Sequence, residues 1–408
     1  MLNFKNSFEK YINPSLIFLI MLTDEIINGN HSFDIAEDII SCEVLQLSQV
    51  IENADGFFSH IKFDPSKHIA FDGKALKAAK KHTFKDLGIE KTHCAVIGEV
   101  AAVEPFPLFT EEAVEIMKWE VFLRPDIIRE CGRRVNLSQG STSRDFQVSG
   151  YVDKTLFTKE AMSHPKTLEI FSTLAGMNLA IPHVFGRGHI NASLADRRGD
   201  QNAESIVDSH LVELLAKQDE DKEHIPSSVH WHYDSVPMVC VLMLEAPENM
   251  IGGETCIKKG NEDVVRIKGP RKGYATLLQG RVIKHMATKP LSNSDRISLV
   301  LSFVPGDPGI VDTTVAVSER PSATPSFLND TFYPNYVNYK FSRIEQRLKN
   351  FRQKLIENSE KGGRFDQLHT IDFCKDIEEY LSGVYKNFEA IDDEPYPPSL
   401  FSIPYSDL

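Results

Sequence analysis

The chain has 408 residues, of which 41% are hydrophobic and 25% are charged, and these fractions are ordinary for a water-soluble globular protein. A formal net charge of −13 disfavours a nucleic-acid groove, which would require a basic face. The length permits one large domain or two small ones.

Residues 1–178 are expected to form a helical and mixed region that buttresses the rest of the protein. The apolar run Leu16–Leu22 is too short to span a bilayer and no small-residue cleavage site follows it, so a buried helix is favoured over a signal peptide. Helices are predicted over 111–123, capped by Thr110, and over 164–176, where Gly176 acts as the stop signal.

The six cysteines are scattered along the chain and form no C-x-x-C pair. This pattern favours free thiols in a reducing compartment over a disulfide framework. We therefore expect a cytoplasmic protein without a membrane segment.

Residues 179–305 are predicted to be the β-rich core. Short segments rich in Val, Ile, Leu and Thr alternate with turns, which favours a sandwich or barrel over a parallel α/β sheet. No G-x-G-x-x-G follows a strand, so a dinucleotide fold is not supported. The charged stretch 195–229 is interpreted as a solvated insertion, with a lid near the site as the alternative. The predicted strands are 182–194, 230–244, 252–259, 264–269, 273–280, 282–289 and 296–305.

Two imidazoles and one carboxylate in the core form a candidate metal site. His232 and Asp234 are two residues apart, so on a strand they would point to the same face. His285 follows 53 residues after His232 and must be brought back by folding. Two imidazoles and a carboxylate can occupy one face of a ferrous ion and leave the other positions open.

Arg296 and Ser298 form a candidate anchor for a dicarboxylate cosubstrate. Arg296 lies 11 residues after His285 across a polar turn, and a hairpin there would return it to the His285 strand. A guanidinium offers a planar, bidentate partner to a carboxylate, and Ser298 shares its strand face. A bidentate 2-oxo acid could fill two open metal positions and O2 the third.

Residues 306–408 are predicted to begin with a Pro/Ser/Thr-rich linker and to continue as helices that pack on the core. One apolar stripe is expected to face the barrel, with a dimer contact as the alternative. The opposite, basic face is interpreted as solvated. The stripe consists of Phe341, Ile344, Leu348, Phe351 and Leu355, and the basic face of Arg343, Arg347, Lys349, Arg352 and Lys354.

Residues 180–305 resemble the catalytic double-stranded β-helix of Fe(II)/2-oxoglutarate-dependent dioxygenases. The metal triad of that superfamily falls on His232, Asp234 and His285, and its Arg-x-Ser anchor on Arg296 and Ser298. Two flanking stretches add to the resemblance without settling the branch. Gly252–Thr255 is similar to the Gly-Gly-Glu-Thr of prolyl 4-hydroxylase-type members, and Gly188–Asn191 to an early core strand of the phytanoyl-CoA hydroxylase-like branch.

The resemblance implies a mainly β fold with flanking helices around a double-stranded β-helix (jelly-roll) core. It also implies an enzyme that uses Fe(II), 2-oxoglutarate and O2 to oxidise a C–H bond of a small molecule or secondary metabolite. Hydroxylation, desaturation, epoxidation and ring formation all remain open. Halogenating relatives lack the carboxylate, so the presence of Asp234 argues against halogenation.

Other functions remain open on the sequence. A peptidyl or amino-acid hydroxylase would use the same residues in an open groove, and a cupin-type metal isomerase would not need Arg296. A scaffold with an inactive site is a further alternative. Each residue pair alone is more often a structural feature, but the agreement of order, spacing and strand context favours the oxygenase.

Several neighbouring residues are weaker candidates. By strand parity His230 is expected to border the pocket, but a cupin metal set would need a Glu where Val236 and Pro237 stand. Arg281 could bind an acidic substrate, although an ion pair is the favoured interpretation. Asn191 and Arg187 are expected, more weakly, to contact the cosubstrate.

Overall fold

The computed structural model describes residues 61–182, apart from most of 123–144, together with residues 188–193, 227–247, 252–267, 271–290, 295–316 and 329–388, and a few single residues between these ranges. The predictions for Leu16–Leu22, for Arg187 and for nearly all of the 195–229 insertion lie outside the described residues. Among the described helices, none is long and apolar enough to cross a membrane.

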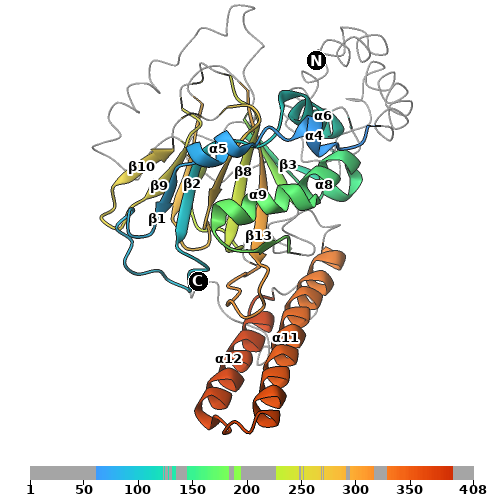
Figure 1. Cartoon of the computed structure of the whole chain (residues 1–408). Helices are drawn as coiled ribbons and strands as arrows, with labels where there is room; N and C mark the ends of the chain where they lie inside the picture. The colour runs from blue at the N-terminus through green and yellow to red at the C-terminus, as the bar shows by residue number, and fades with distance from the viewer. Residues whose placement is uncertain are drawn as a thin grey trace, which may run out of the picture.

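Two antiparallel sheets form the centre of the protein (Figure 1). In the nine-stranded sheet the order is β1-β2-β11-β8-β13-β6-β4-β3, and β5 pairs with the far end of β13. The four-stranded sheet has the order β10-β9-β12-β7. The large sheet contains β1 (Lys81–Thr83), β2 (Val100–Pro107), β3 (Gly132–Arg134), β4 (Asp145–Ser149), β5 (Leu179–Ala180), β6 (His189–Ser193), β8 (Met238–Glu245), β11 (Tyr274–Leu278) and β13 (Arg296–Pro305), and the small sheet contains β7 (Ser227–His232), β9 (Thr255–Lys258), β10 (Val264–Ile267) and β12 (His285–Thr288).

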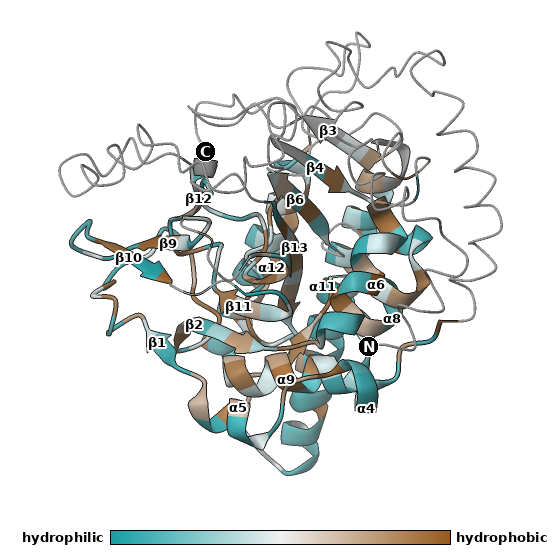
Figure 2. Ribbon diagram, turned by 90° about the horizontal axis from the view of Figure 1, so that it is seen from above, coloured by the Kyte–Doolittle hydropathy of each residue, from teal (hydrophilic) through white to brown (hydrophobic). Residues whose placement is uncertain are grey.

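Alternating side chains along β8 pack into two different hydrophobic cores. Val239 packs with Ile257 of β9 and Leu278 of β11, and so helps to join the two sheets face to face. Cys240 and Leu242 point the other way, into the layer beneath the helices. A strand that is apolar on both faces is expected when both faces are covered. Figure 2 shows the layers from above, with β9 and β10 on one side of the large sheet and α6 and α8 on the other.

Helices from the N-terminal region cover the outer face of the large sheet. The two helices predicted around 111–123 and 164–176 are confirmed as α6 and α9, and Gly176 ends α9 in the left-handed conformation with φ 71°. Phe171 of α9 packs its ring 4.7 Å from that of Phe303 on β13, which fixes this helix against the sheet. The helical elements are α4 (Pro65–His68), α5 (Gly73–Ala78), α6 (Glu111–Phe122), η3 (Val152–Lys154), α8 (Leu156–Ser163) and α9 (Pro165–Ala175).

The predicted strands are found, but one of them is divided into two strands, and this division affects the site. The segment 230–244 forms two strands in different sheets, because β7 ends at His232 and β8 begins at Met238. The residues between them form a loop that crosses from the small sheet to the large one. The segment 182–194 is shorter than predicted, since β6 contains only His189–Ser193.

A long helical hairpin, α11 (Asn329–Glu360) and α12 (Gln367–Tyr385), projects from the body (Figure 1). The two helices pack on each other through Phe351, whose ring stacks on Phe373 at a centroid distance of 4.0 Å. The prediction that the apolar stripe of α11 faces the barrel is wrong for Phe341 and Leu348, which are 46% and 47% exposed. Of the five residues in the stripe, only Ile344 and Phe351 are covered in part.

The basic face of α11 is also only partly solvated. Arg343 is buried and donates hydrogen bonds to the backbone carbonyls of Pro305, Asp307 and Ile310. Arg347 is buried as well and pairs with Asp376 of α12. Arg343 therefore joins the hairpin to the segment that follows β13 rather than facing water.

Asp312 anchors both hairpin helices to the segment after β13. This buried carboxylate accepts hydrogen bonds from Lys340 Nζ at 3.0 Å, Tyr339 Oη at 3.0 Å and Tyr380 Oη at 2.8 Å. Its other oxygen accepts from the backbone N–H of Thr314 at 3.0 Å and from the Thr314 hydroxyl. Burial alone would raise the pKa of Asp312, but the Lys340 ammonium and these donors hold it well below its usual range.

Candidate metal centre

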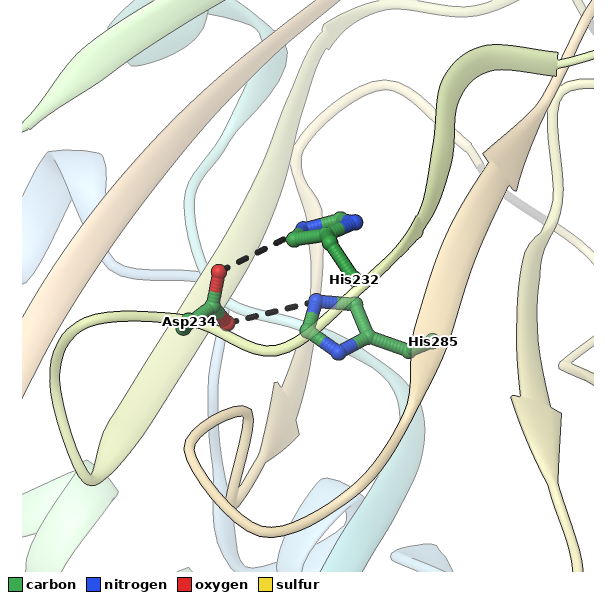
Figure 3. Close-up of side chains that lie close together, drawn as sticks. All are labelled: His232, Asp234 and His285. Carbon is green, nitrogen blue, oxygen red and sulfur yellow. Dashed lines mark ion pairs between the residues drawn. The ribbon is translucent and has the colours of Figure 1, made fainter. Parts of the chain in front are cut away.

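The pairing of β7 with β12 places two imidazoles side by side. His232 ends β7 and His285 begins β12, and the two residues are direct partners in the antiparallel register. Their ring centroids lie 4.3 Å apart. Because residues directly opposite each other in a ladder point to the same face, both rings project from the same face of the small sheet (Figure 3).

Asp234 reaches the two imidazoles from the loop after β7, and not from the same strand as predicted. Its backbone N–H donates to the carbonyl of Gly280 at 2.9 Å, which holds the loop against the turn before His285. The carboxylate Oδ1 lies 3.4 Å from His232 Nε2, and Oδ2 lies 3.2 Å from His285 Nε2. A Cβ atom at position 280 would collide with Asp234 Oδ2, so this approach requires glycine.

Backbone carbonyls fix the tautomer of both imidazoles. His232 Nδ1 lies 2.6 Å from the carbonyl of His230, and His285 Nδ1 lies 2.9 Å from the carbonyl of Ile283. A carbonyl oxygen only accepts, so each Nδ1 must carry the proton. Each neutral ring then presents an unprotonated Nε2 toward Asp234, which is the form that coordinates a metal.

In the absence of a metal, the Asp234 carboxylate and the His285 imidazole stabilise each other's charged forms. Asp234 Oδ2 is buried and makes no hydrogen bond among the described residues. Burial alone would raise the pKa of Asp234, but the two imidazoles hold it well below its usual range. Burial likewise opposes the charged form of His285, yet the Asp234 carboxylate raises the pKa of this imidazole. A proton and a cation therefore compete for the same Nε2 atom.

This donor set fits a ferrous ion. The three side chains offer one ligand atom each, and these atoms lie within 4.8 Å of one another. Two imidazole nitrogens and one carboxylate oxygen on one side of an octahedral ion leave three positions for exogenous ligands. A cation would also provide the partner that the buried Asp234 Oδ2 lacks.

Arg296 is buried at the start of β13, where it connects the two sheets. Its Nε donates to the carbonyl of Gly253 at 2.9 Å, and Nη1 donates to Ser298 Oγ at 3.1 Å. Burial lowers the pKa of Arg296 to about 10, and the charge of Glu254 opposes this shift. The guanidinium therefore stays charged at neutral pH while two of its donors hold it in one orientation.

The Gly-Gly-Glu-Thr stretch supports Arg296, a role that sequence reasoning missed. Gly253 has φ +75°, and a Cβ atom there would lie 3.2 Å from Arg296 Cδ and 2.7 Å from Met250 Cε. Glu254 is held in turn by the Thr288 hydroxyl, which donates to its Oε2 at 2.9 Å. The only sequence signal for this role was the pair of adjacent glycines, which marks a close approach of the backbone to another group.

A small pocket adjoins Arg296 between the sheets. It is lined mainly by apolar and hydroxyl side chains, with the guanidinium as its charged group. The lining residues are Pro105, Val241, Met243, Gly253, Thr255, Ile267, Tyr274, Thr276 and Arg296.

The weaker candidates take more peripheral places. His230 is exposed, and its backbone carbonyl rather than its imidazole supports His232, so the prediction that its side chain borders the pocket is wrong. Asn191 lies directly opposite Ser298 in the register, but its amide oxygen accepts from Gln147 at 2.8 Å. Arg281 donates through Nε to the carbonyl of Thr313 at 3.2 Å.

Comparison with known proteins gives matches at the level of structure. No family model and no curated protein matches the sequence. The structure is similar to the non-heme α-ketoglutarate-dependent epimerase SnoN from nogalamycin biosynthesis, with 16% identity, coverage of 48% of this chain and 73% of that chain, and a TM-score of 0.33.

It is also similar to the α-ketoglutarate-dependent carbocyclase SnoK from the same biosynthesis, with 12% identity, coverage of 58% and 85%, and a TM-score of 0.35. A third neighbour is an oxidoreductase of the 2OG-Fe(II) oxygenase family from Burkholderia pseudomallei, with 12% identity, coverage of 43% and 74%, and a TM-score of 0.29.

Proposed function

We propose that this protein is an Fe(II)/2-oxoglutarate-dependent dioxygenase that acts on a small molecule. The observation that carries the proposal is the convergence of two imidazole Nε2 atoms and the Asp234 carboxylate, with His232 Nε2 beside Oδ1 and His285 Nε2 beside the buried Oδ2. A fixed, buried guanidinium beside a pocket supplies the second requirement, a seat for a dicarboxylate. We further propose that residues 179–305 form a jelly-roll catalytic core. The N-terminal region adds β1 and β2 to one edge of its large sheet and β3 and β4 to the other, and the flanking helices pack on it.

In this proposal His232, Asp234 and His285 hold the iron. When bound, iron and 2-oxoglutarate would supply the activation of O2, with release of succinate and CO2 and oxidation of a substrate C–H bond. The protein contributes preorganised ligands, since the His230 and Ile283 carbonyls hold both rings in the coordinating tautomer.

Arg296 and Ser298 are proposed to bind the far carboxylate of 2-oxoglutarate. The guanidinium uses Nε on Gly253 and Nη1 on Ser298, and it has further N–H groups for a carboxylate. Because the side chain is buried and fixed, little conformational entropy is lost when the ligand binds. The apolar walls of the pocket would exclude water around this charged pair and strengthen it.

The test is an anaerobic calorimetric titration with Fe(II) and then with 2-oxoglutarate, followed by assay of succinate release with a panel of small molecules. Asp234→Ala is expected to abolish Fe(II) binding. Arg296→Ala should bind Fe(II) as the wild type does but lose about 100-fold in affinity for 2-oxoglutarate, because removing one partner of a buried charge pair costs about 2–5 kcal/mol.

Lys159→Ala is the matched control, because Lys159 is an exposed cation on α8 and should leave both affinities unchanged. If Arg296→Ala binds 2-oxoglutarate as tightly as the wild type, the cosubstrate assignment fails and a cupin-type isomerase is favoured. If peptides rather than small molecules stimulate succinate release, the enzyme is a peptidyl hydroxylase instead.

A further inference from the structure

The α11–α12 hairpin carries most of the exposed large apolar side chains in the described part of the protein. Nine of the fourteen such residues lie between 341 and 385. Leu368 is 75% exposed and Phe365 63%, and each belongs to the distal end of the hairpin. Exposed apolar residues scattered singly need no explanation, but a concentration on one projecting element marks an interaction surface.

The apolar residues of α11 follow a heptad. Phe341, Leu348 and Leu355 are spaced by seven residues and are 46%, 47% and 38% exposed. Ile344 and Phe351 occupy the intermediate positions, and Phe351 is the one that stacks on α12. A repeat of alternating three- and four-residue steps is the pattern by which helices pack as bundles. One half of the pattern is used within the hairpin, and the other half is left on its surface.

The two helices also carry opposite charge. Between residues 347 and 354, α11 has four cations and no acidic residue, whereas between 372 and 379, α12 has four carboxylates and one lysine. Within the hairpin, Arg347 pairs with Asp376. A surface that presents a basic helix beside an acidic helix is complementary to a copy of itself turned by a two-fold axis.

We propose that two copies of this chain dimerise through their α11–α12 hairpins. In the dimer, α11 of one copy lies on α12 of the other, which forms a four-helix bundle. The heptad residues Phe341, Leu348 and Leu355 are buried against the apolar residues of the partner's acidic helix. A two-fold axis makes this contact twice, so each copy contributes the same surface and the assembly closes as a dimer.

The dimer is tested by sedimentation velocity of the full chain at micromolar concentrations. The wild type is expected to sediment as a dimer, and the double variant Leu348→Glu/Leu355→Glu as a monomer. Leu156→Glu is the matched control, because Leu156 is 60% exposed on α8 and should leave the dimer intact. Circular dichroism of the double variant checks that the hairpin remains helical.

A charge-swap experiment tests the arrangement of the helices. One copy carries Lys349→Glu/Arg352→Glu, which makes α11 acidic, and the other carries Glu378→Lys/Glu379→Lys, which makes α12 basic. Each variant alone is expected to dimerise at least tenfold more weakly, because like charges then face each other. Mixing the two should restore dimers, since both contacts in the mixed pair are complementary.

A monomeric wild type would overturn the proposal, whether the hairpin is then covered by another segment of the chain or by a different protein. A dimer that survives Leu348→Glu/Leu355→Glu would overturn the assignment of the surface. Failure of the charge-swapped copies to pair would overturn the basic-on-acidic arrangement.

Discussion

Two buried carboxylates of this protein, Asp234 and Asp312, have opposite surroundings. Asp312 accepts hydrogen bonds from a backbone N–H, three hydroxyls and the Lys340 ammonium. Asp234 faces two imidazoles, and its buried Oδ2 makes no hydrogen bond among the described residues. The pKa of both groups is held below the ordinary range, so the pKa alone does not separate them.

The difference lies in the donors. A buried carboxylate surrounded by donors is complete, and its role is to join segments of the fold. A buried carboxylate that faces two imidazole nitrogens can be neutralised either by protons on those nitrogens or by a bound cation. The same residue type therefore serves as an anchor in one place and as a candidate ligand in the other.

The largest expected effect separates the two carboxylates by stability. Asp312→Ala should lower the free energy of unfolding by about 3–5 kcal/mol, because it leaves the Lys340 ammonium buried without its counter-ion. Asp234→Ala should cost less than Asp312→Ala in metal-free protein, because Asp234 has fewer donors to lose. Urea unfolding in the presence of a chelator measures both values. Equal losses for the two variants would contradict the comparison.

Added Fe(II) should increase the stability of the folded protein through Asp234 and not through Asp312. Under anaerobic conditions, Fe(II) at about 100 times its dissociation constant is expected to stabilise the wild type by about 2.7 kcal/mol. Asp234→Ala should show no such gain. The milder variant Asp312→Asn should show the full gain on its lower baseline, which urea unfolding with and without Fe(II) would reveal.

Acid should remove the contribution of Asp312. The folded-state pKa of this carboxyl lies below the unfolded value of about 3.9, so its stabilising effect is present above that value and is lost as the pH falls. The stability gap between the wild type and Asp312→Asn should be constant above about pH 5 and should narrow below about pH 4. Urea unfolding across this range measures the gap, and a gap that widens in acid would contradict the assignment.

The smallest effect is expected from a single donor to Asp312. Tyr380→Phe removes one hydrogen bond of 2.8 Å and leaves the other donors in place. The cost should be about 0.5–1.5 kcal/mol in the free energy of unfolding. Tyr385→Phe on the exposed end of α12 serves as the control and should cost less.

The helices α6 and α9 and the strands of the core could be predicted from the sequence, because each of these elements carries its own periodicity. The strand containing Arg296 is rich in Val, Ile and Leu and follows a polar turn in the sequence, and α9 has both its apolar spacing and its terminal glycine. The three metal-site residues were also predicted, since residue type and order identify them without coordinates. What the sequence could not give was the exit of Asp234 from the strand, because this depends on a hydrogen bond to Gly280, 46 residues away.

The surroundings of the C-terminal helix were predicted less well. Amphipathic spacing shows that α11 has an apolar face but does not say which surface covers it. Whether Arg343 is solvated depends on three carbonyls, one at the end of β13 and two after it, and no local pattern marks them. The charge pattern of a helix shows which residues share a face, whereas the burial of that face depends on the segment that packs against it.

The glycine at position 280 offers a practical control for experiments in living cells. A single methyl group there would collide with the carboxylate while all three candidate ligand side chains remain encoded. Such an allele would separate the consequences of lost chemistry from those of a missing protein, which deletion of the gene cannot do.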